Sequence, residues 1–235
     1  MRYAIYFTPS SSDPLLRVAA NWLGRNAFSG KPVKTPHIRG LGLEQIARIT
    51  EEPRRYGFHA TLKAPFRLAE GFSEADLLRA LMAFGNANRR VTIPKLEIAP
   101  LGKFFAVVPS EPLPELQRFA SEIVVAFDRF RAPLTEADRA RRKSQKLTPS
   151  QAANLEYWGY PYVHDDFRFH MTLTGPIDEK DQPGVEQILA DFFAPVLDEP
   201  AEISNLALFV EPEPGAPFEI HSLHPLTATD MRKTA

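Results

Sequence analysis

Apolar and polar positions alternate or recur along this chain in a way that predicts a regular succession of strands and helices. Residues 2–8 alternate between apolar and mixed side chains, which predicts a strand. Residues 13–24 place leucines and alanines on one helical stripe after an Asp-Pro start, which predicts a capped helix. The same reasoning predicts helices over 43–50, 73–84, 114–130 and 181–193, and strands over 91–99, 103–109, 202–210 and 217–223.

One kind of strand occurs twice, as RRYGFHATLKAPF over 54–66 and as DFRFHMTLTGPI over 166–177. Each copy is followed by a predicted helix and two predicted strands, so the two halves of the chain repeat one order of elements. Short loops after the paired strands favour antiparallel sheets. We therefore predict an α+β fold with two pseudo-twofold-related lobes. They form a single bilobal domain over 1–235, with approximate halves 1–130 and 161–235 and a basic helical connector over 131–160.

The two repeated strands each have an apolar face and a polar face, because successive side chains point to opposite sides of a strand. We expect the apolar face of each copy to enter the core of its own lobe. The polar face of the first copy carries His59, Thr61 and Lys63, and that of the second carries Arg168, His170, Thr172 and Thr174. A duplicated strand kept only for packing would explain the matching Phe and Leu positions, but not the matching polar positions.

Composition narrows the classes of protein that remain. The formal net charge is −1, from 28 basic and 29 acidic residues, which disfavours an extended phosphate-backbone footprint but permits a small anionic ligand. There is no cysteine, which excludes disulfides, thiol nucleophiles and thiolate zinc sites. No apolar stretch approaches the roughly 18 residues of a membrane span, and the first strand is too short for a signal-peptide core. We expect a cytoplasmic protein with no membrane partner.

General acid–base catalysis is the chemistry that suits the two polar faces best. Two histidines make a poor catalytic zinc site, and no carboxylate shares either face, so we expect no metal and no cofactor. No serine-elbow or phosphate-loop pattern is present. One neutral imidazole can accept a proton from an attacking oxygen while a protonated one donates to the leaving oxygen. The threonine hydroxyls can bind phosphoryl oxygens, with Lys63, Arg168 and Thr174 as further substrate-binding candidates.

The flanking context of both His-x-Thr strands resembles the two-histidine (2H) phosphoesterase superfamily, and in particular a bacterial branch associated with phosphonate-metabolism operons. The likeness rests on RRYGFHATLKAPF and YGYPYVHDDFRFHMTLTG and extends over nearly the whole chain. It implies a central cleft between two lobes and metal-independent phosphoester chemistry. It also implies that His59, Thr61, His170 and Thr172 are the catalytic residues. Better-known members act on cyclic phosphates, which suggests a small cyclic sugar or nucleotide phosphate as substrate.

Two other functions stay open from the sequence. An RNA 2′,3′-cyclic phosphate phosphodiesterase or RNA-ligase-like enzyme is kept open by the basic cluster over 139–146, which is either a solvated connector or a cationic flap over substrate. A non-catalytic nucleotide-binding module would use the same cleft without turnover. Matching imidazoles on both strands favour an enzyme, because binding alone needs cations more than imidazoles. The sequence does not define the oligomeric state.

Overall fold

The computed structural model describes residues 1–143 and 146–229, except the side chains of 141–143. Its strands form a seven-stranded sheet in the order β4-β5-β6-β2-β1-β8-β9 and a separate pair, β3-β7. Every strand pairing is antiparallel, which confirms the predicted α+β class. The strands are β1 (Arg2–Phe7), β2 (Ala60–Phe66), β3 (Val91–Ile93), β4 (Leu96–Leu101), β5 (Phe104–Pro109), β6 (Met171–Thr172), β7 (Ala201–Ile203), β8 (Asn205–Glu211) and β9 (Glu219–Pro225).

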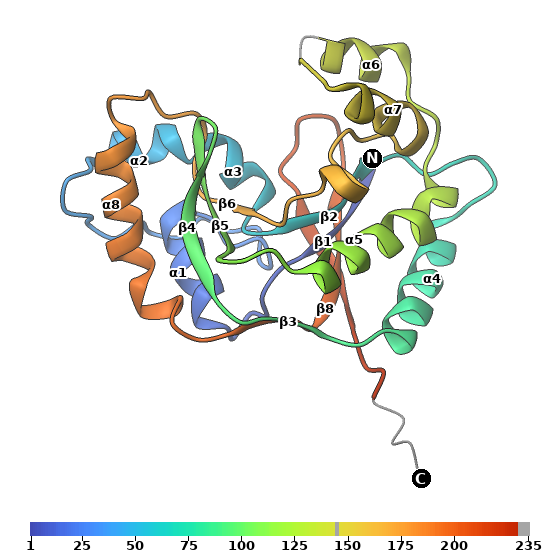
Figure 1. Cartoon of the computed structure of the whole chain (residues 1–235), viewed down its shortest axis with the longest axis horizontal. Coiled ribbons are helices and arrows are strands. Elements are labelled where there is room, and N and C mark those ends of the chain that lie inside the picture. Colours follow the sequence, from blue (N-terminus) through green and yellow to red (C-terminus); the bar gives the residue numbers. More distant parts are fainter. Residues whose placement is uncertain (144–145, 230–235) are drawn as a thin grey trace.

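The helices lie around this sheet, as Figure 1 shows. They are α1 (Pro14–Leu23), α2 (Leu43–Ile49), α3 (Glu51–Tyr56), α4 (Glu74–Ala87), α5 (Pro114–Phe127), α6 (Glu136–Lys143), α7 (Pro149–Trp158) and α8 (Gln182–Phe193), with short 3₁₀ turns η1 (Asp128–Phe130), η2 (His164–Asp166) and η3 (Ala194–Val196). Local sequence determines where several begin. The Asp13 side chain caps α1, and Ser73 forms a capping box with Asp76 at the start of α4. No helix in the described ranges is long and apolar enough to cross a membrane.

One face of the sheet is buried beneath helices and the other carries little apolar cover. Tyr3, Ile5 and Phe7 of β1 belong to a large core cluster that includes side chains from α1, α4, α5 and α8. The alternate residues Ala4 and Tyr6 belong to a small cluster on the opposite face. The large cluster contains residues from both halves of the chain, so the expectation of one core for each half is wrong. Cross-pairing of the halves in one sheet merges the two apolar faces.

The internal repeat predicted from the sequence is present in the order of elements. The run β2-α4-β3-β4-β5 in the first half is matched by β6-α8-β7-β8-β9 in the second. Equivalent strands pair with each other, β2 with β6 and β3 with β7. The hairpins are exchanged, because β5 of the first half pairs with β6, whereas β8 of the second half pairs with β1. The division into lobes at 131–160 stays a prediction.

Four predicted elements differ in their boundaries. The strand expected over 91–99 is interrupted at Pro94, which has no backbone N–H for a sheet hydrogen bond, and continues as β4. The strand over 202–210 divides into β7 and β8. The run from Arg54 that was expected to be extended begins as helix α3, which ends at Gly57. The second His-x-Thr strand has only two residues in regular pairing, within β6.

The connector between the halves forms α6 and α7, at the upper right of Figure 1. It carries the basic cluster over 139–146, of which Arg139 is ion-paired with Glu156 at 3.2 Å and Lys146 is exposed. The side chains of Arg141, Arg142 and Lys143 lie outside the described residues. The choice between a connector and a flap therefore stays open.

Candidate functional site

The two His-x-Thr strands lie next to each other in the middle of the sheet. Strands β2 and β6 pair antiparallel with Ala60 opposite Met171. Extending this register sets His59 opposite Thr172 and Thr61 opposite His170, with all four side chains on one face. On one face of an antiparallel pair, diagonal neighbours are about 7–8 Å apart. The sequence predicted imidazoles that converge from two separate lobes, whereas the structure brings the motif residues together as neighbours within one sheet.

Each imidazole is oriented by the same backbone contact. Nδ1 of His59 lies 2.9 Å from the carbonyl oxygen of Gly57, and Nδ1 of His170 lies 2.7 Å from that of Arg168. A carbonyl oxygen only accepts hydrogen bonds, so Nδ1 is the donor in both rings. In a neutral ring this leaves Nε2 with its lone pair. Nε2 of His59 lies 3.3 Å from the Thr61 hydroxyl, which places this nitrogen beside the other motif residue.

Gly57 makes the first of these contacts possible. Its φ of 77° and ψ of 175° belong to a region that is essentially restricted to glycine. A Cβ at this position would lie 2.5 Å from Cβ of Ala27. The chain therefore needs glycine here to end α3, to pass Ala27 and to present its carbonyl oxygen to His59.

Aromatic rings surround His59. The ring of Tyr6 is stacked on the imidazole, with centroids 3.9 Å apart, and those of Tyr56 and Phe209 lie at 6.0 and 5.9 Å. This burial lowers the pKa of His59 to about 4; the Gly57 hydrogen bond opposes the shift and the nearby His170 adds to it. Thr61 is the residue opposite Tyr6 on β2 and lies beside its phenol.

His170 has a more open environment. The nearest ring to it among the described aromatic contacts is Phe104, at 5.9 Å and tilted by 50°. Burial lowers the pKa of His170 as well, with the hydrogen bond to the Arg168 carbonyl opposing the shift, but the displacement is smaller than for His59. The two histidines share one tautomer and differ in their surroundings, so the free protein has two neutral imidazoles of unequal basicity at neutral pH.

Lys63 does not share the face of His59, which corrects the sequence prediction. Tyr6 is opposite Thr61, yet Ile5 is opposite Lys63, so β2 contains one extra residue in a β-bulge. The bulge reverses the alternation, and Lys63 points to the core face. Its ammonium group, 3% exposed, donates to the carbonyl oxygen of Val124 and to Asp128, at 3.2 and 3.1 Å. Burial lowers its pKa to about 8.

Thr174 also departs from the predicted arrangement. It is buried, and its hydroxyl oxygen accepts a hydrogen bond of 3.0 Å from the N–H of Phe105. Regular pairing ends at Thr172, so alternation no longer determines where Thr174 points. Its role in binding substrate stays a prediction. Arg168 is exposed, and its backbone carbonyl orients His170. A role for its side chain in binding phosphate stays a prediction.

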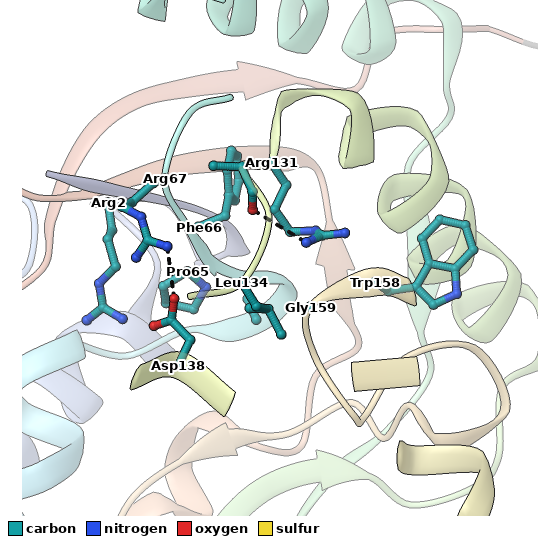
Figure 2. Close-up of a pocket in the computed structure, with 11 residues that line it drawn as sticks. Arg2, Pro65, Phe66, Arg67, Arg131, Leu134, Asp138, Trp158 and Gly159 are labelled. Carbon is teal, nitrogen blue, oxygen red and sulfur yellow. Dashed lines mark hydrogen bonds and ion pairs between the residues drawn. The ribbon is translucent and has the colours of Figure 1, made fainter. Parts of the chain in front are cut away.

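Two residues of β1 that sequence reasoning did not select lie on the same face as the imidazoles. They are Arg2 and Tyr6, which precede and follow Ala4 in the alternation RYAIYF. The sequence feature that could have identified them is the side of this strand that carries polar residues, in a strand that is otherwise apolar. Arg2 is ion-paired with Glu211, which is 1% exposed and also binds Arg55. Figure 2 shows Arg2 at the edge of a small hollow together with Arg67 and Asp138.

The described residues contain no group of three or more His, Cys, Asp or Glu side chains arranged to hold a metal ion. The polar residues gathered on this face are instead imidazoles, hydroxyls and, further along, guanidinium groups. The fold and this face define an α+β protein with paired His-x-Thr strands.

Comparison of the chain with known protein families identifies the family to which it belongs. Residues 61–219 match the family described as "Protein of unknown function (DUF1045)", and the chain belongs to that family. Two relatives are named ribose 1,5-bisphosphate phosphokinase PhnN. The one from Janthinobacterium sp. (strain Marseille) is 41% identical over 92% of this chain and 49% of its own length. The one from Laribacter hongkongensis (strain HLHK9) is 36% identical over 94% of this chain and 50% of its own.

The chain therefore spans about half the length of the two relatives. Among solved structures, one described as "Crystal structure of phosphoesterase" aligns with 97% of this chain and 99% of its own. The identity is 11% and the TM-score is 0.39.

Proposed function

We propose that this protein is a phosphoesterase of the two-histidine type that hydrolyses a cyclic phosphodiester of a small sugar or nucleotide without a metal ion. His59 and His170 are its acid and base, and Thr61 and Thr172 bind the phosphoryl oxygens. One observation carries the proposal. Adjacent strands present two His-x-Thr motifs on one face, and each imidazole is anchored through Nδ1, which leaves Nε2 as the nitrogen for proton transfer.

The proposed reaction needs only these groups and water. The water oxygen attacks phosphorus while Nε2 of one histidine accepts its proton. The bond between phosphorus and one ring oxygen breaks, and the other histidine, protonated, gives its proton to that oxygen. The products are a phosphate monoester and a free hydroxyl, and one proton has moved from one ring to the other before solvent restores both. Hydroxyl donors stabilise the charge on the non-bridging oxygens.

The unequal surroundings of the two rings support an assignment of roles. His59, with a pKa of about 4, is the ring that stays neutral when substrate arrives and accepts the proton from water. Burial lowers the pKa of His170 in the free protein. An anion bound beside this more open ring would raise that pKa, so we assign to His170 the proton for the leaving oxygen. The order of the two pKa values, rather than their absolute positions, supports this assignment.

The relatives suggest the class of sugar. Their name assigns them a kinase reaction on ribose 1,5-bisphosphate, and this chain corresponds to only half of each. The chain has no phosphate-loop pattern, so we do not extend kinase activity to it. Hydrolysis of a ribose 1,2-cyclic phosphate at the bond to O2 leaves a phosphate on O1. If the sugar already carries a phosphate on O5, the product is ribose 1,5-bisphosphate. We propose that this half supplies that compound to the kinase reaction, in keeping with a link to phosphonate metabolism.

A panel of cyclic phosphates tests the proposal. It contains ribose 1,2-cyclic phosphates, mononucleoside 2′,3′-cyclic phosphates and short RNA with cyclic ends, each assayed with and without EDTA. We expect turnover of a small cyclic phosphate that EDTA does not affect. His59→Gln and His170→Gln should each lower kcat by about 10²–10⁴-fold. His37→Gln, a change at an exposed loop histidine, serves as control.

Three outcomes would contradict the proposal. Loss of activity with EDTA alone would contradict a metal-independent mechanism. Turnover confined to RNA would favour the RNA phosphodiesterase alternative. Tight nucleotide binding without any product, unchanged in both His→Gln variants, would favour a binding module.

A further inference from the structure

A second cationic site lies further along the face that carries the imidazoles. Tyr3 of β1 is opposite Phe66 of β2, and both point into the core. The next residues outward are Arg2 of β1 and Arg67, which directly follows β2. Extending the register by one position sets the two arginines next to each other on the other face, and both line one hollow. Like charges directly opposite each other destabilise a sheet unless anions lie near them. This arrangement therefore favours an anion between or beside the two guanidinium groups.

The protein supplies only part of that negative charge. Arg2 donates from Nε to the buried Glu211, and Arg67 donates from Nη2 to Asp138 at 2.9 Å and to the carbonyl oxygen of Pro133 at 3.5 Å. Within residues 1–143 and 146–229, the two Nη groups of Arg2 have no hydrogen-bond partner, nor do Nε and Nη1 of Arg67. Each arginine thus keeps two nitrogens available for a further acceptor.

These two arginines line the hollow drawn in Figure 2, where their guanidinium groups lie toward the side that Asp138 occupies. A third arginine, Arg131, also lines it but binds Asp128 and the carbonyl oxygen of Tyr157. The hollow has a volume of about 40 Å³. That exceeds the roughly 10–15 Å³ that one water molecule requires, so a small polar group can enter the hollow.

The hollow is within one small ligand's reach of the imidazoles. Arg2 and Tyr6 share a face of β1 and are four residues apart, about 13 Å along the strand. Arg2 interacts electrostatically with the phenols of Tyr6 and Tyr56, and both of these rings lie beside His59. On β2, Thr61 and Pro65 are both partly exposed, and Pro65 lines the hollow.

We propose that Arg2 and Arg67 bind a second phosphate of the substrate, at the end of the sheet face remote from the reacting cyclic phosphate. The preferred substrate is then a sugar or nucleotide that carries a terminal phosphate in addition to the cyclic one. That the reacting group is a cyclic phosphate rests on the proposed function. That a terminal phosphate binds rests on the two arginines alone.

Matched substrates test the inference. Adenosine 2′,3′-cyclic phosphate is compared with the same compound bearing a 5′-phosphate. We expect wild-type kcat/KM to be about 10- to 100-fold higher for the 5′-phosphorylated compound, the size of one or two charge-assisted hydrogen bonds. Arg67→Gln and Arg2→Gln should reduce that preference at least about tenfold. Arg118→Gln, at an exposed arginine of α5, should leave it intact.

Equal preference in wild type and both variants would overturn the inference. Arg2→Gln removes one of the two arginines that bind the buried Glu211, so the folding of this variant is checked by circular dichroism. If Arg2→Gln unfolds, the test rests on Arg67→Gln, because Arg67 is more exposed. A second measurement separates this inference from the proposed function: calorimetry compares the affinity of the protein for ribose 5-phosphate with its affinity for ribose. Arginine-dependent binding of ribose 5-phosphate without turnover of any cyclic phosphate would leave the inference standing. Turnover of cyclic phosphates with no preference for ribose 5-phosphate over ribose would leave only the proposed function.

Discussion

The phenol ring of Tyr6 is stacked on the imidazole of His59, with ring centroids 3.9 Å apart and planes inclined by 21°. Tyr6 is almost fully buried, so it covers one side of a polar ring that would otherwise face water. Its own pKa is raised well above the usual value by the same burial. The stack fixes the plane of the imidazole, while the hydrogen bond to Gly57 fixes its rotation.

Replacing Tyr6 should change the acid–base behaviour of His59. We expect Tyr6→Leu to raise the pKa of His59 from about 4 toward the unperturbed value near 6.5, because water regains access to the ring. Tyr6→Phe keeps the stacked ring and should leave the pKa near its original value. The pKa is measured by NMR titration of the His59 ring protons, with His170 as the internal reference. An unchanged His59 pKa in Tyr6→Leu would show that the stack does not control it.

The stability of the protein should fall in mild acid. His59 has a pKa near 4 in the folded protein and near 6.5 when unfolded, so between these values the unfolded chain binds a proton that the folded protein does not. Neutral His59 makes its full contribution to the free energy of unfolding above pH 6.5. As the pH falls to about 4, that free energy decreases by about 2–3 kcal/mol. The lowered pKa values of His170 and His224 act in the same direction.

Urea unfolding at pH 7 and at pH 4.5 measures this effect. The difference between the two free energies of unfolding should shrink in His59→Gln and persist in His37→Gln, whose side chain is exposed. If His59→Gln keeps the full pH dependence, the imidazole of His59 is not the buried neutral group described here.

Lys63 should matter for stability and not for turnover. Lys63→Met keeps an apolar stem of similar length but removes the ammonium group that binds Asp128, which retains Arg131 as a partner at 2.8 Å. We expect a loss of about 1–3 kcal/mol in the free energy of unfolding. With the protein folded, kcat/KM should stay within about twofold of wild type, a difference of less than 0.5 kcal/mol. Lys103→Met, at an exposed position, is the control. A folded Lys63→Met variant with severely reduced kcat/KM would restore the prediction that Lys63 binds substrate.

Gly57→Ala should damage both folding and the orientation of His59. The new Cβ would lie 2.5 Å from Cβ of Ala27, and the backbone conformation is one that alanine rarely adopts. We expect a loss of about 2–4 kcal/mol in stability and, in the folded fraction, a kcat at least tenfold lower. Gly184→Ala in α8, where an added Cβ meets nothing within 4 Å, should be neutral or slightly stabilising. A neutral Gly57→Ala would refute the requirement for glycine at this position.

Much of the local structure could be predicted from the sequence, because it depends on residues close together in the chain. The apolar stripe and Asp13 predict α1, the Ser73 capping box predicts the start of α4, and both are present. The α+β class and the repeated order of elements likewise follow from local periodicity. The two His-x-Thr motifs could be found for the same reason, since alternation in a strand has a period of two.

The arrangement of the site required the tertiary structure, because it depends on which strands are neighbours. Pairing of Ala60 with Met171 brings the two motifs side by side in one sheet, and no local pattern specifies that partner. An extra residue in β2, between the positions opposite Tyr6 and Ile5, turns Lys63 from the imidazole face to the core, since an inserted position reverses the alternation until the next register shift. The stack of Tyr6 on His59 likewise joins strands more than 50 residues apart. Sequence periodicity therefore determined which residues alternate, and long-range pairing decided what each of them faces.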